Sequence, residues 1–204
     1  EDQNTYHCNP MIDILDTENL HFGQDGSIHT WTDGSYDRKQ DTSAWSVFFA
    51  ENSIYNRKGR TPGKQSNNTG ELEAIIEAIQ CTPPSQSLSI FTDSTYAIRA
   101  FSNPRKLFWK NRIPIIRLRK CLQKRYFQNV QLFKVKAHSG NFGNEMADRL
   151  AKEGLQLPTI LNDPIEGLNI TILKSVTSYG DSIFRETIQD QCFKDMTISA
   201  SYSR

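Results

Sequence analysis

The chain has 204 residues, in which 24 Lys and Arg stand against 23 Asp and Glu, so its formal net charge is +1. Hydrophobic residues make up 37% and charged residues 23%, as in ordinary globular proteins, which excludes a collagen-like, a coiled-coil or a wholly disordered chain. No run approaches the ~18 apolar residues that a membrane span needs, and no charged-then-apolar leader opens the sequence, so we expect no membrane partner. Taken alone, the net charge also argues against a nucleic-acid partner.

The first part of the chain predicts an arm followed by three strands. Residues 1–27 are acidic and weakly periodic, and we expect an N-terminal arm or linker there. A strand is expected at Ile28–Asp33, ended by the turn signal Asp33-Gly34-Ser35. Ser43–Ala50 is rich in Trp, Val and Phe, and Ile54–Arg60 is its expected hairpin partner.

Helices and strands are then expected to alternate. Apolar residues from Leu72 to Ile79 recur at the i, i+3, i+4, i+7 spacing of a helix, which Pro83-Pro84 ends. Leu88–Thr92 predicts a strand buried on both faces, and Ser94–Phe101 the helix after it.

The segments after residue 101 complete the expected core. Two helical pieces, interrupted at Pro104 and Pro114, run to Tyr126, and a strand follows at Val130–Ala137. A last helix is expected at Asn144–Glu153, ended by Gly154. Strands that alternate with helices after an initial hairpin predict an α/β domain with a mixed sheet. Residues 155–204 form a C-terminal extension whose role the sequence does not indicate.

The four cysteines bear on the compartment. Cys8, Cys81, Cys121 and Cys192 lie 73, 40 and 71 residues apart, which fits neither a zinc site nor a dense disulfide framework. We therefore expect a reducing, intracellular environment, cytoplasmic or nuclear. The length allows one domain of ~150 residues with appendages.

The charges are segregated along the chain. Residues 1–37 contain eight acids and no Lys or Arg, whereas residues 94–144 contain twelve bases and no Asp or Glu. Such a run can be a solvated helix face, but twelve bases without a paired acid repel one another unless an anion neutralises them. A phosphate backbone is the commonest anion of that size, so the distribution favours the nucleic-acid partner that the net charge argues against.

Four carboxylates fall at positions where a metal site would need them. Asp33 ends the first strand, Glu71 opens the first long helix, Asp93 ends the central strand, and Asp148 lies in the last helix of the core. Ligand-binding groups in open α/β sheets gather at strand ends, so these four side chains can converge.

Three of the four have an ordinary structural alternative outside any site. Asp33 can form an Asx turn, and Asp93 can cap the helix that follows it. Asp148 can pair with Lys152 one helical turn later, in an exposed salt bridge worth ~0.3–0.5 kcal/mol.

The fourth carboxylate also has a neighbour of the same type. Glu71 can complete a variant capping box with Asn68, which would make it a helix-terminus residue only. The helical periodicity does not choose between Glu71 and Glu73, which flank the apolar stripe on opposite sides.

Five short blocks surround these residues. They are Thr32-Asp33-Gly34-Ser35, Asn67-Asn68-Thr69-Gly70-Glu71-Leu72, Thr92-Asp93-Ser94, His138, and Gly143-Asn144-Glu145-x-Ala147-Asp148-x-Leu150-Ala151-Lys152. In this order the blocks resemble the ribonuclease H family, type 1. The resemblance implies an RNase H-like α/β fold, with a five-stranded mixed sheet flanked by helices, and a catalytic domain at residues 28–154.

The resemblance also implies a chemistry. Asp33, Glu71, Asp93 and Asp148 would be ligands of two Mg²⁺ ions, for which Mn²⁺ can substitute, and carboxylate oxygens are the hard ligands that such ions prefer. Asp33 would bridge both ions, with Glu71 and Asp93 on the leaving-group side and Asp148 on the water side. The implied reaction is endonucleolytic hydrolysis of the RNA strand of an RNA–DNA hybrid, leaving 5′-phosphate and 3′-hydroxyl ends.

A histidine follows the last expected strand. His138 lies in the turn Lys136-Ala137-His138-Ser139-Gly140, where a surface histidine without function is the ordinary alternative. An unperturbed imidazole titrates near ~6.5, so it can carry or pass a proton at working pH. The position of His138, ten residues before Asp148, matches the family, and the resemblance implies a role in proton transfer or product release.

Recognition must separate RNA from DNA. The 2′-hydroxyl is read best by backbone and amide groups in a shallow minor groove, and Asn67 and Asn68 supply amides beside Glu71, with helix capping as the alternative for Asn68. Lys64 and Ser66 match the positions where the family grips a phosphate of the DNA strand, although the family often has Arg and Thr there.

The basic stretch from Arg105 to Arg125 stands where some family members carry a hybrid-gripping protrusion. Its candidate hybrid contacts are Lys106, Trp109, Lys110 and Arg112. We expect them to contribute nonspecific affinity that falls with added salt.

Three functions compete on this fold. A catalytically silent hybrid-binding or tethering domain would usually lose a carboxylate, and an integrase-like phosphoryl transferase would have no reason to keep Asn67-Asn68 or the His138 turn. All four carboxylates are present, so we predict an active endoribonuclease. The closing stretch Gly143–Gly154 is similar to RNase H domains attached to retroelement reverse transcriptases, which makes a reverse transcriptase or polyprotein containing this chain an expected partner.

Overall fold

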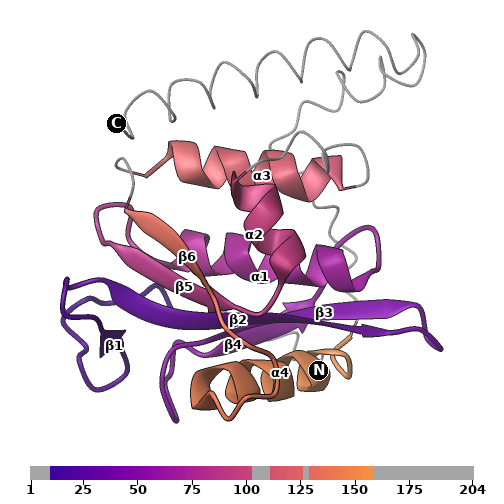
Figure 1. The fold of residues 1–204 in the computed structure, drawn as a ribbon, viewed down its shortest axis with the longest axis horizontal. Coiled ribbons are helices and arrows are strands. Elements are labelled where there is room, and N and C mark those ends of the chain that lie inside the picture. The colour runs from indigo at the N-terminus through magenta and orange to yellow at the C-terminus, as the bar shows by residue number, and fades with distance from the viewer. Residues whose placement is uncertain (1–9, 103–110, 126–128, 159–204) are drawn as a thin grey trace, which may run out of the picture. The chain divides into compact units, whose positions relative to one another are not determined.

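A mixed β-sheet forms the centre of the computed structural model, which describes residues 10–102, 111–125 and 129–158 (Figure 1). The sheet order is β4-β3-β2-β5-β6, and a short β1 pairs with β2. The strands β2, β3 and β4 are antiparallel neighbours, whereas β5 and β6 join β2 in parallel. The strand bounds are β1 His21–Phe22, β2 Ile28–Asp37, β3 Thr42–Phe48, β4 Arg57–Arg60, β5 Leu88–Thr92 and β6 Val130–Lys134.

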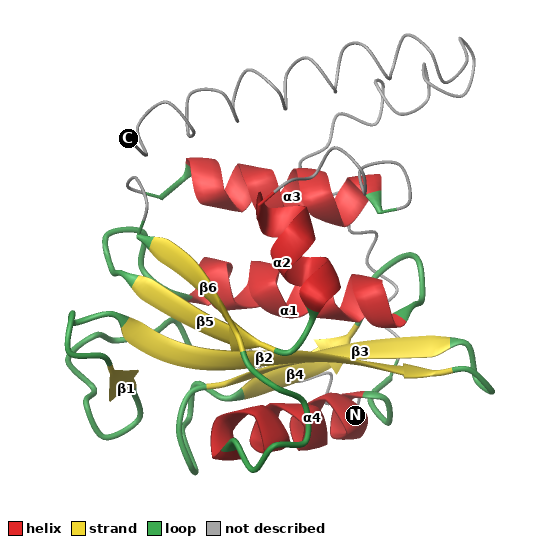
Figure 2. Cartoon of the chain, in the orientation of Figure 1, coloured by secondary structure: helices red, strands yellow, loops and turns green. Residues whose placement is uncertain are grey.

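Helices cover both faces of this sheet. Figure 2 shows α1, α2 and α3 on one face and α4 on the other. The helix bounds are α1 Asn67–Cys81, α2 Thr95–Ser102, α3 Arg112–Gln123 and α4 Phe142–Gly154. The predicted five-stranded mixed sheet flanked by helices is therefore confirmed, with the two-residue β1 as a sixth strand. None of the helices in the described ranges is long and apolar enough to cross a membrane.

The turn predicted at Asp33-Gly34-Ser35 is wrong, because β2 continues to Asp37 and pairs with β3 along that length. Gly34 serves close packing instead. A Cβ atom on Gly34 would lie 2.3 Å from the backbone nitrogen of Glu71, so only glycine lets β2 approach the first turns of α1 this closely. The hairpin turn follows Asp37, and Asp41 adopts a positive φ of 47° there.

Helix α1 begins earlier than the capping-box alternative requires. Ser66 is its N-cap, and the Ser66 side chain accepts a hydrogen bond from the Thr69 amide at 3.2 Å. Glu71 is therefore inside the helix, and Asn68 does not cap it. The apolar stripe from Leu72 to Ile79 is buried as predicted.

Two helical pieces, interrupted at Pro104 and Pro114, are predicted for the basic segment, and its described residues contain one helix, α3. Pro114 lies in the first turn of α3, where a missing N–H costs no intrahelical hydrogen bond, so the predicted interruption there is wrong. The strand β6 ends at Lys134 rather than Ala137, and α4 begins at Phe142, two residues before the expected start. The C-terminal extension lies, from residue 159 onward, outside the described residues.

The arm or linker expected over residues 1–27 is, from residue 10 onward, packed against the core. Ile12 and Leu20 are each 4% exposed. The Ile12 amide donates to the Cys81 carbonyl at 3.2 Å, and the Tyr55 hydroxyl donates to Asp16 at 3.1 Å. The domain boundaries at residues 28 and 154 stay a prediction.

Aromatic side chains connect the sheet to α4. Trp31 stacks on Phe91, and Phe91 stacks on Phe133, with ring centroids 5.2 Å apart in both pairs. Gly143, in the first turn of α4, lies against the Trp31 ring: a Cβ atom there would be 2.2 Å from Trp31 Cδ2. This contact fixes how closely α4 approaches β2.

Candidate metal centre

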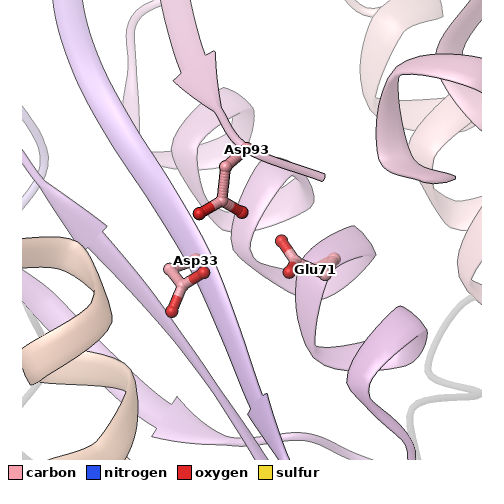
Figure 3. Close-up of side chains that lie close together, drawn as sticks. All are labelled: Asp33, Glu71 and Asp93. Atoms are coloured by element: carbon pink, nitrogen blue, oxygen red, sulfur yellow. The ribbon is translucent and has the colours of Figure 1, made fainter. Parts of the chain in front are cut away.

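Three carboxylates meet where β2, β5 and α1 come together. One oxygen atom of each of Asp33, Glu71 and Asp93 lies within 4.8 Å of the other two, and Figure 3 shows the side chains close together. Asp33 and Asp93 are brought close by the parallel pairing of β2 and β5, in which Thr32 is the register partner of Thr92. Glu71 reaches the group because α1 packs closely over Gly34.

Burial and mutual repulsion make this group unfavourable as three free anions. Asp33 is 6% exposed and Glu71 is 3% exposed. Burial, followed by the charges of Asp93 and Asp148, raises the pKa of Asp33 to about 8. Burial, followed by the charges of Asp33 and Asp93, raises the pKa of Glu71 well above its usual value.

The same group fits a divalent cation. Glu71 Oε2 is buried and has no hydrogen-bond partner among the described residues. A buried carboxylate oxygen without a partner is costly, and a bound cation would satisfy it. All three residues offer hard oxygen ligands, the type that Mg²⁺ and Mn²⁺ prefer.

The fourth carboxylate lies apart from these three. Asp148 is on α4, and its Oδ2 accepts a hydrogen bond from Lys152 Nζ at 2.7 Å. The i+4 salt bridge considered as an alternative is therefore present. Asp148 is nevertheless close enough for its charge to raise the pKa of Asp33. The structure thus brings three of the four predicted ligands close together, and the fourth, Asp148, is paired with Lys152.

The structure also resolves the choice between the two glutamates of α1. Glu73 points to α3, where Arg117 holds it with two hydrogen bonds of 2.6 and 2.8 Å. Asp93 does not cap α2, because the Ser94 hydroxyl accepts from the Ala97 amide in that position. Glu71, rather than Glu73, is therefore the glutamate that joins Asp33 and Asp93 in the group of three carboxylates.

Four of the expected substrate contacts lie at the start of α1 and in the loop just before it. Asn67 donates to Glu71 Oε1 at 3.4 Å, and Ser66 caps the helix. Lys64 and Asn68 are exposed. The roles of these four residues in binding a hybrid stay a prediction.

Of the other predicted site residues, the structure describes His138 and Arg112. His138 is exposed, with a positive φ of 50°, in the turn between β6 and α4. Arg112 is the first residue of α3. Lys106, Trp109 and Lys110 lie outside the described residues.

Some bases of the segment 94–144 are used inside the protein. Arg117 pairs with Glu73, so the expectation that no acid pairs with this stretch is wrong. The Arg125 guanidinium donates to the Ile79 and Thr82 carbonyls at 3.1 and 2.9 Å, and Arg119 donates to the Phe101 carbonyl at 2.9 Å. Counting charges along the sequence overstates the bases that are available to a phosphate backbone.

One residue beside the carboxylates has no role in the sequence-based prediction. Asn144 Nδ2 donates to Asp93 Oδ2 at 3.0 Å. The signal in the sequence is its spacing: Asn144 lies one helical turn before Asp148, so both residues lie on the same face of α4.

The sheet and its converging acids define an α/β protein with a candidate divalent-metal centre. Comparison with known proteins gives the family. A family model described as RNase H matches residues 25–156, so the chain belongs to the RNase H family.

Relatives with the name ribonuclease H come from distant organisms. Ribonuclease H1 of Homo sapiens is 31% identical over 144 residues, covering 62% of this chain and 49% of the relative. Ribonuclease H of Orientia tsutsugamushi is 28% identical over 146 residues, covering 62% of this chain and 81% of the relative. Ribonuclease H of Bordetella pertussis is 27% identical over 149 residues, covering 68% and 96%. The chain thus spans about half the length of the human relative and most of the bacterial ones.

The raised pKa values predict an unusual pH dependence of stability without metal. The folded protein keeps a proton on Asp33 up to about pH 8, whereas the unfolded chain loses it near pH 3.8, so the free energy of unfolding should fall as the pH rises between these values. We expect Asp33→Asn to be more stable than the wild type at pH 8, by roughly 1–3 kcal/mol, and to lose this advantage at pH 4. Urea denaturation of the wild type and of Asp33→Asn, each at pH 4 and at pH 8 in the presence of a chelator, measures these free energies of unfolding. An equal stability of the two proteins across this pH range would contradict the prediction.

Proposed function

We propose that the protein hydrolyses the RNA strand of RNA–DNA hybrids endonucleolytically, leaving 5′-phosphate and 3′-hydroxyl ends. The observation that carries the proposal is the group Asp33, Glu71 and Asp93, three buried or half-buried carboxylates within 4.8 Å in a member of the RNase H family. A purely structural role would not favour like charges at this separation, because their repulsion destabilises the fold.

The carboxylates would hold two divalent ions, Mg²⁺ or Mn²⁺. Bound there, such ions neutralise the acids and supply Lewis-acid chemistry for phosphodiester hydrolysis. Asp33, Glu71 and Asp93 are the core of the proposed ligand set, and Asp148, which pairs with Lys152, would be its fourth member. Asn67 holds Glu71 Oε1 and so restrains the orientation of that ligand. His138, which is exposed in the turn between β6 and α4, is proposed to act in proton transfer or in product release.

The proposed substrate contacts surround the N-terminus of α1. Asn67 and Asn68 supply amides for the 2′-hydroxyl groups of the RNA strand. Lys64 and Ser66 would contact a phosphate of the DNA strand, near the positive end of the α1 dipole. Lys106, Trp109, Lys110 and Arg112 are proposed to bind the hybrid backbone, with a strong dependence on salt.

The wider context is also a proposal. The stretch Gly143–Gly154 supports a reverse transcriptase or polyprotein as the parent of this domain, acting inside the cell, in the cytoplasm or the nucleus. Sequencing the coding region on both sides tests the parent directly. Flanking sequence without a polymerase domain would contradict it.

Three labelled substrates test the proposed function. With Mg²⁺, we expect cleavage of an RNA–DNA hybrid and no cleavage of duplex RNA or duplex DNA, and a chelator should reduce cleavage to background until Mg²⁺ or Mn²⁺ is restored. The products should carry 5′-phosphate ends. Cleavage of duplex DNA with an intact hybrid would favour an integrase-like transferase. Binding of the hybrid without any cleavage would favour a silent tethering domain.

A further inference from the structure

A buried amide holds one of the carboxylates of the proposed metal centre. Asn144 is 3% exposed, and its Nδ2 donates to Asp93 Oδ2 at 3.0 Å. A carboxylate only accepts hydrogen bonds, so the N–H group must face Asp93. Asn144 Oδ1 has no hydrogen-bond partner among the described residues, which leaves the Asp93 contact as the main polar interaction of this side chain.

The position of Asn144 is fixed by the first turn of α4. Its backbone N–H donates to Oδ1 of the N-cap Asn141 at 3.0 Å. Gly143, the preceding residue, lies against the Trp31 ring with no room for a side chain. Since α4 is held at both points, the Asn144 amide has a defined place relative to β2 and β5.

The main chain and the side chain of Asp93 are then held separately. Lys134 Nζ donates to the Asp93 carbonyl oxygen and, at 2.8 Å, to Thr95 Oγ1. Asn144 holds Oδ2 of the side chain. Without Asn144, the Asp93 carboxylate loses the hydrogen bond that holds its Oδ2, so it would be free to rotate away from Asp33 and Glu71.

We infer that Asn144 is a positioning residue of the carboxylate group: it fixes Asp93 so that this carboxylate can share a divalent cation with Asp33 and Glu71. The inference rests on the proposed function for the identity of the ligand as a divalent cation. Groups that orient metal ligands through a hydrogen bond usually affect metal affinity about 10–100-fold. The same size of effect is expected here.

The test measures Mg²⁺ binding with and without catalysis. The Tm of the protein is followed as a function of Mg²⁺ concentration in the absence of nucleic acid, and hybrid cleavage is followed over the same concentrations. For Asn144→Ala we expect the Mg²⁺ midpoint to rise about tenfold in both measurements. Saturating Mg²⁺ should restore most of the cleavage rate, and KM for the hybrid should stay unchanged, which a general loss of structure would not produce.

A control variant removes a comparable amide elsewhere. Asn56 accepts from the Phe49 amide and donates to the Ala50 carbonyl, both at 2.7 Å, in the loop between β3 and β4. Asn56→Ala should lower Tm but leave the Mg²⁺ midpoint as in the wild type. Asn144→Leu keeps the side-chain volume without the donor and should show the same midpoint as Asn144→Ala, which covers the case that the alanine variant does not fold.

The outcomes separate this inference from the proposed function. A wild-type midpoint in Asn144→Ala and Asn144→Leu, or an equal shift in Asn56→Ala, would overturn the positioning role alone. If Mg²⁺ raises the wild-type Tm but the hybrid is not cut, the proposed function fails, and the Tm titration still decides the role of Asn144. If Mg²⁺ leaves the wild-type Tm unchanged, both fail.

Discussion

Asp93→Asn is expected to lower the rate of hybrid cleavage at least about 10²–10³-fold, while the affinity for the hybrid stays near that of the wild type. The substitution keeps the size of the side chain but removes the charge that a divalent cation needs at the end of β5. Hybrid binding should persist because the proposed contacts of Asn67, Asn68 and Lys64 are on or before α1. Cleavage of a labelled hybrid at saturating Mg²⁺ and a binding titration in a chelator measure the two effects.

Asp37→Asn is the matched control for this variant. Asp37 ends β2, outside the three-carboxylate group, and accepts a hydrogen bond from the Lys39 amide at 2.8 Å. It should cleave at the wild-type rate. Cleavage by Asp93→Asn at the wild-type rate would contradict the assignment of Asp93 as a metal ligand. An equal loss of cleavage in both variants would show that removing either negative charge lowers the rate, so that Asp93 has no specific role.

Glu73→Ala is expected to lower the free energy of unfolding by about 3 kcal/mol, with cleavage retained below Tm. Glu73 has 8% and Arg117 has 20% of the side chain exposed, and they form two hydrogen bonds. Removing the acid leaves the guanidinium in a largely dry place between α1 and α3 without its partner. Urea denaturation at pH 7 measures the loss, and the hybrid assay at a temperature well below Tm measures activity.

Glu153→Ala provides the comparison for that experiment. Glu153 pairs with Lys58 at the surface, where the two side chains are 46% and 32% exposed. An exposed ion pair is worth about 0–1 kcal/mol, so this variant should unfold near the wild-type urea concentration. An equal loss of unfolding free energy in the two variants would mean that the Glu73–Arg117 pair stabilises the fold no more than an exposed ion pair does.

Local patterns in the sequence were sufficient for most of the architecture. The stripe from Leu72 to Ile79 predicts α1, and the apolar run Leu88–Thr92 predicts β5 with the bounds that the structure has. Gly34 was misleading because glycine after aspartate is a turn signal, whereas here it permits an approach between β2 and α1. That contact joins segments far apart in the chain, and no local pattern reports it.

The site could be predicted only in part, because it too depends on contacts between segments that are far apart in the chain. Spacing and family resemblance brought Asp33, Glu71 and Asp93 together, but periodicity alone could not separate Glu71 from Glu73. The distinction depends on Arg117, which lies on a different helix. Likewise, the amide of Asn144 is visible as a contact of Asp93 only once α4 is placed on the sheet.

The parallel pairing of β2 with β5 has a consequence for the order of folding. Asp33 and Asp93 are far apart in the chain, so the connection through α1 must close, at a cost in loop entropy, before they meet, and we expect this pairing to form late in folding. The cost of burying these acids close together would then be absent from most of the folding pathway and would arise mainly in the native state. A cation that offsets this cost should therefore slow the unfolding reaction more than it speeds the folding reaction.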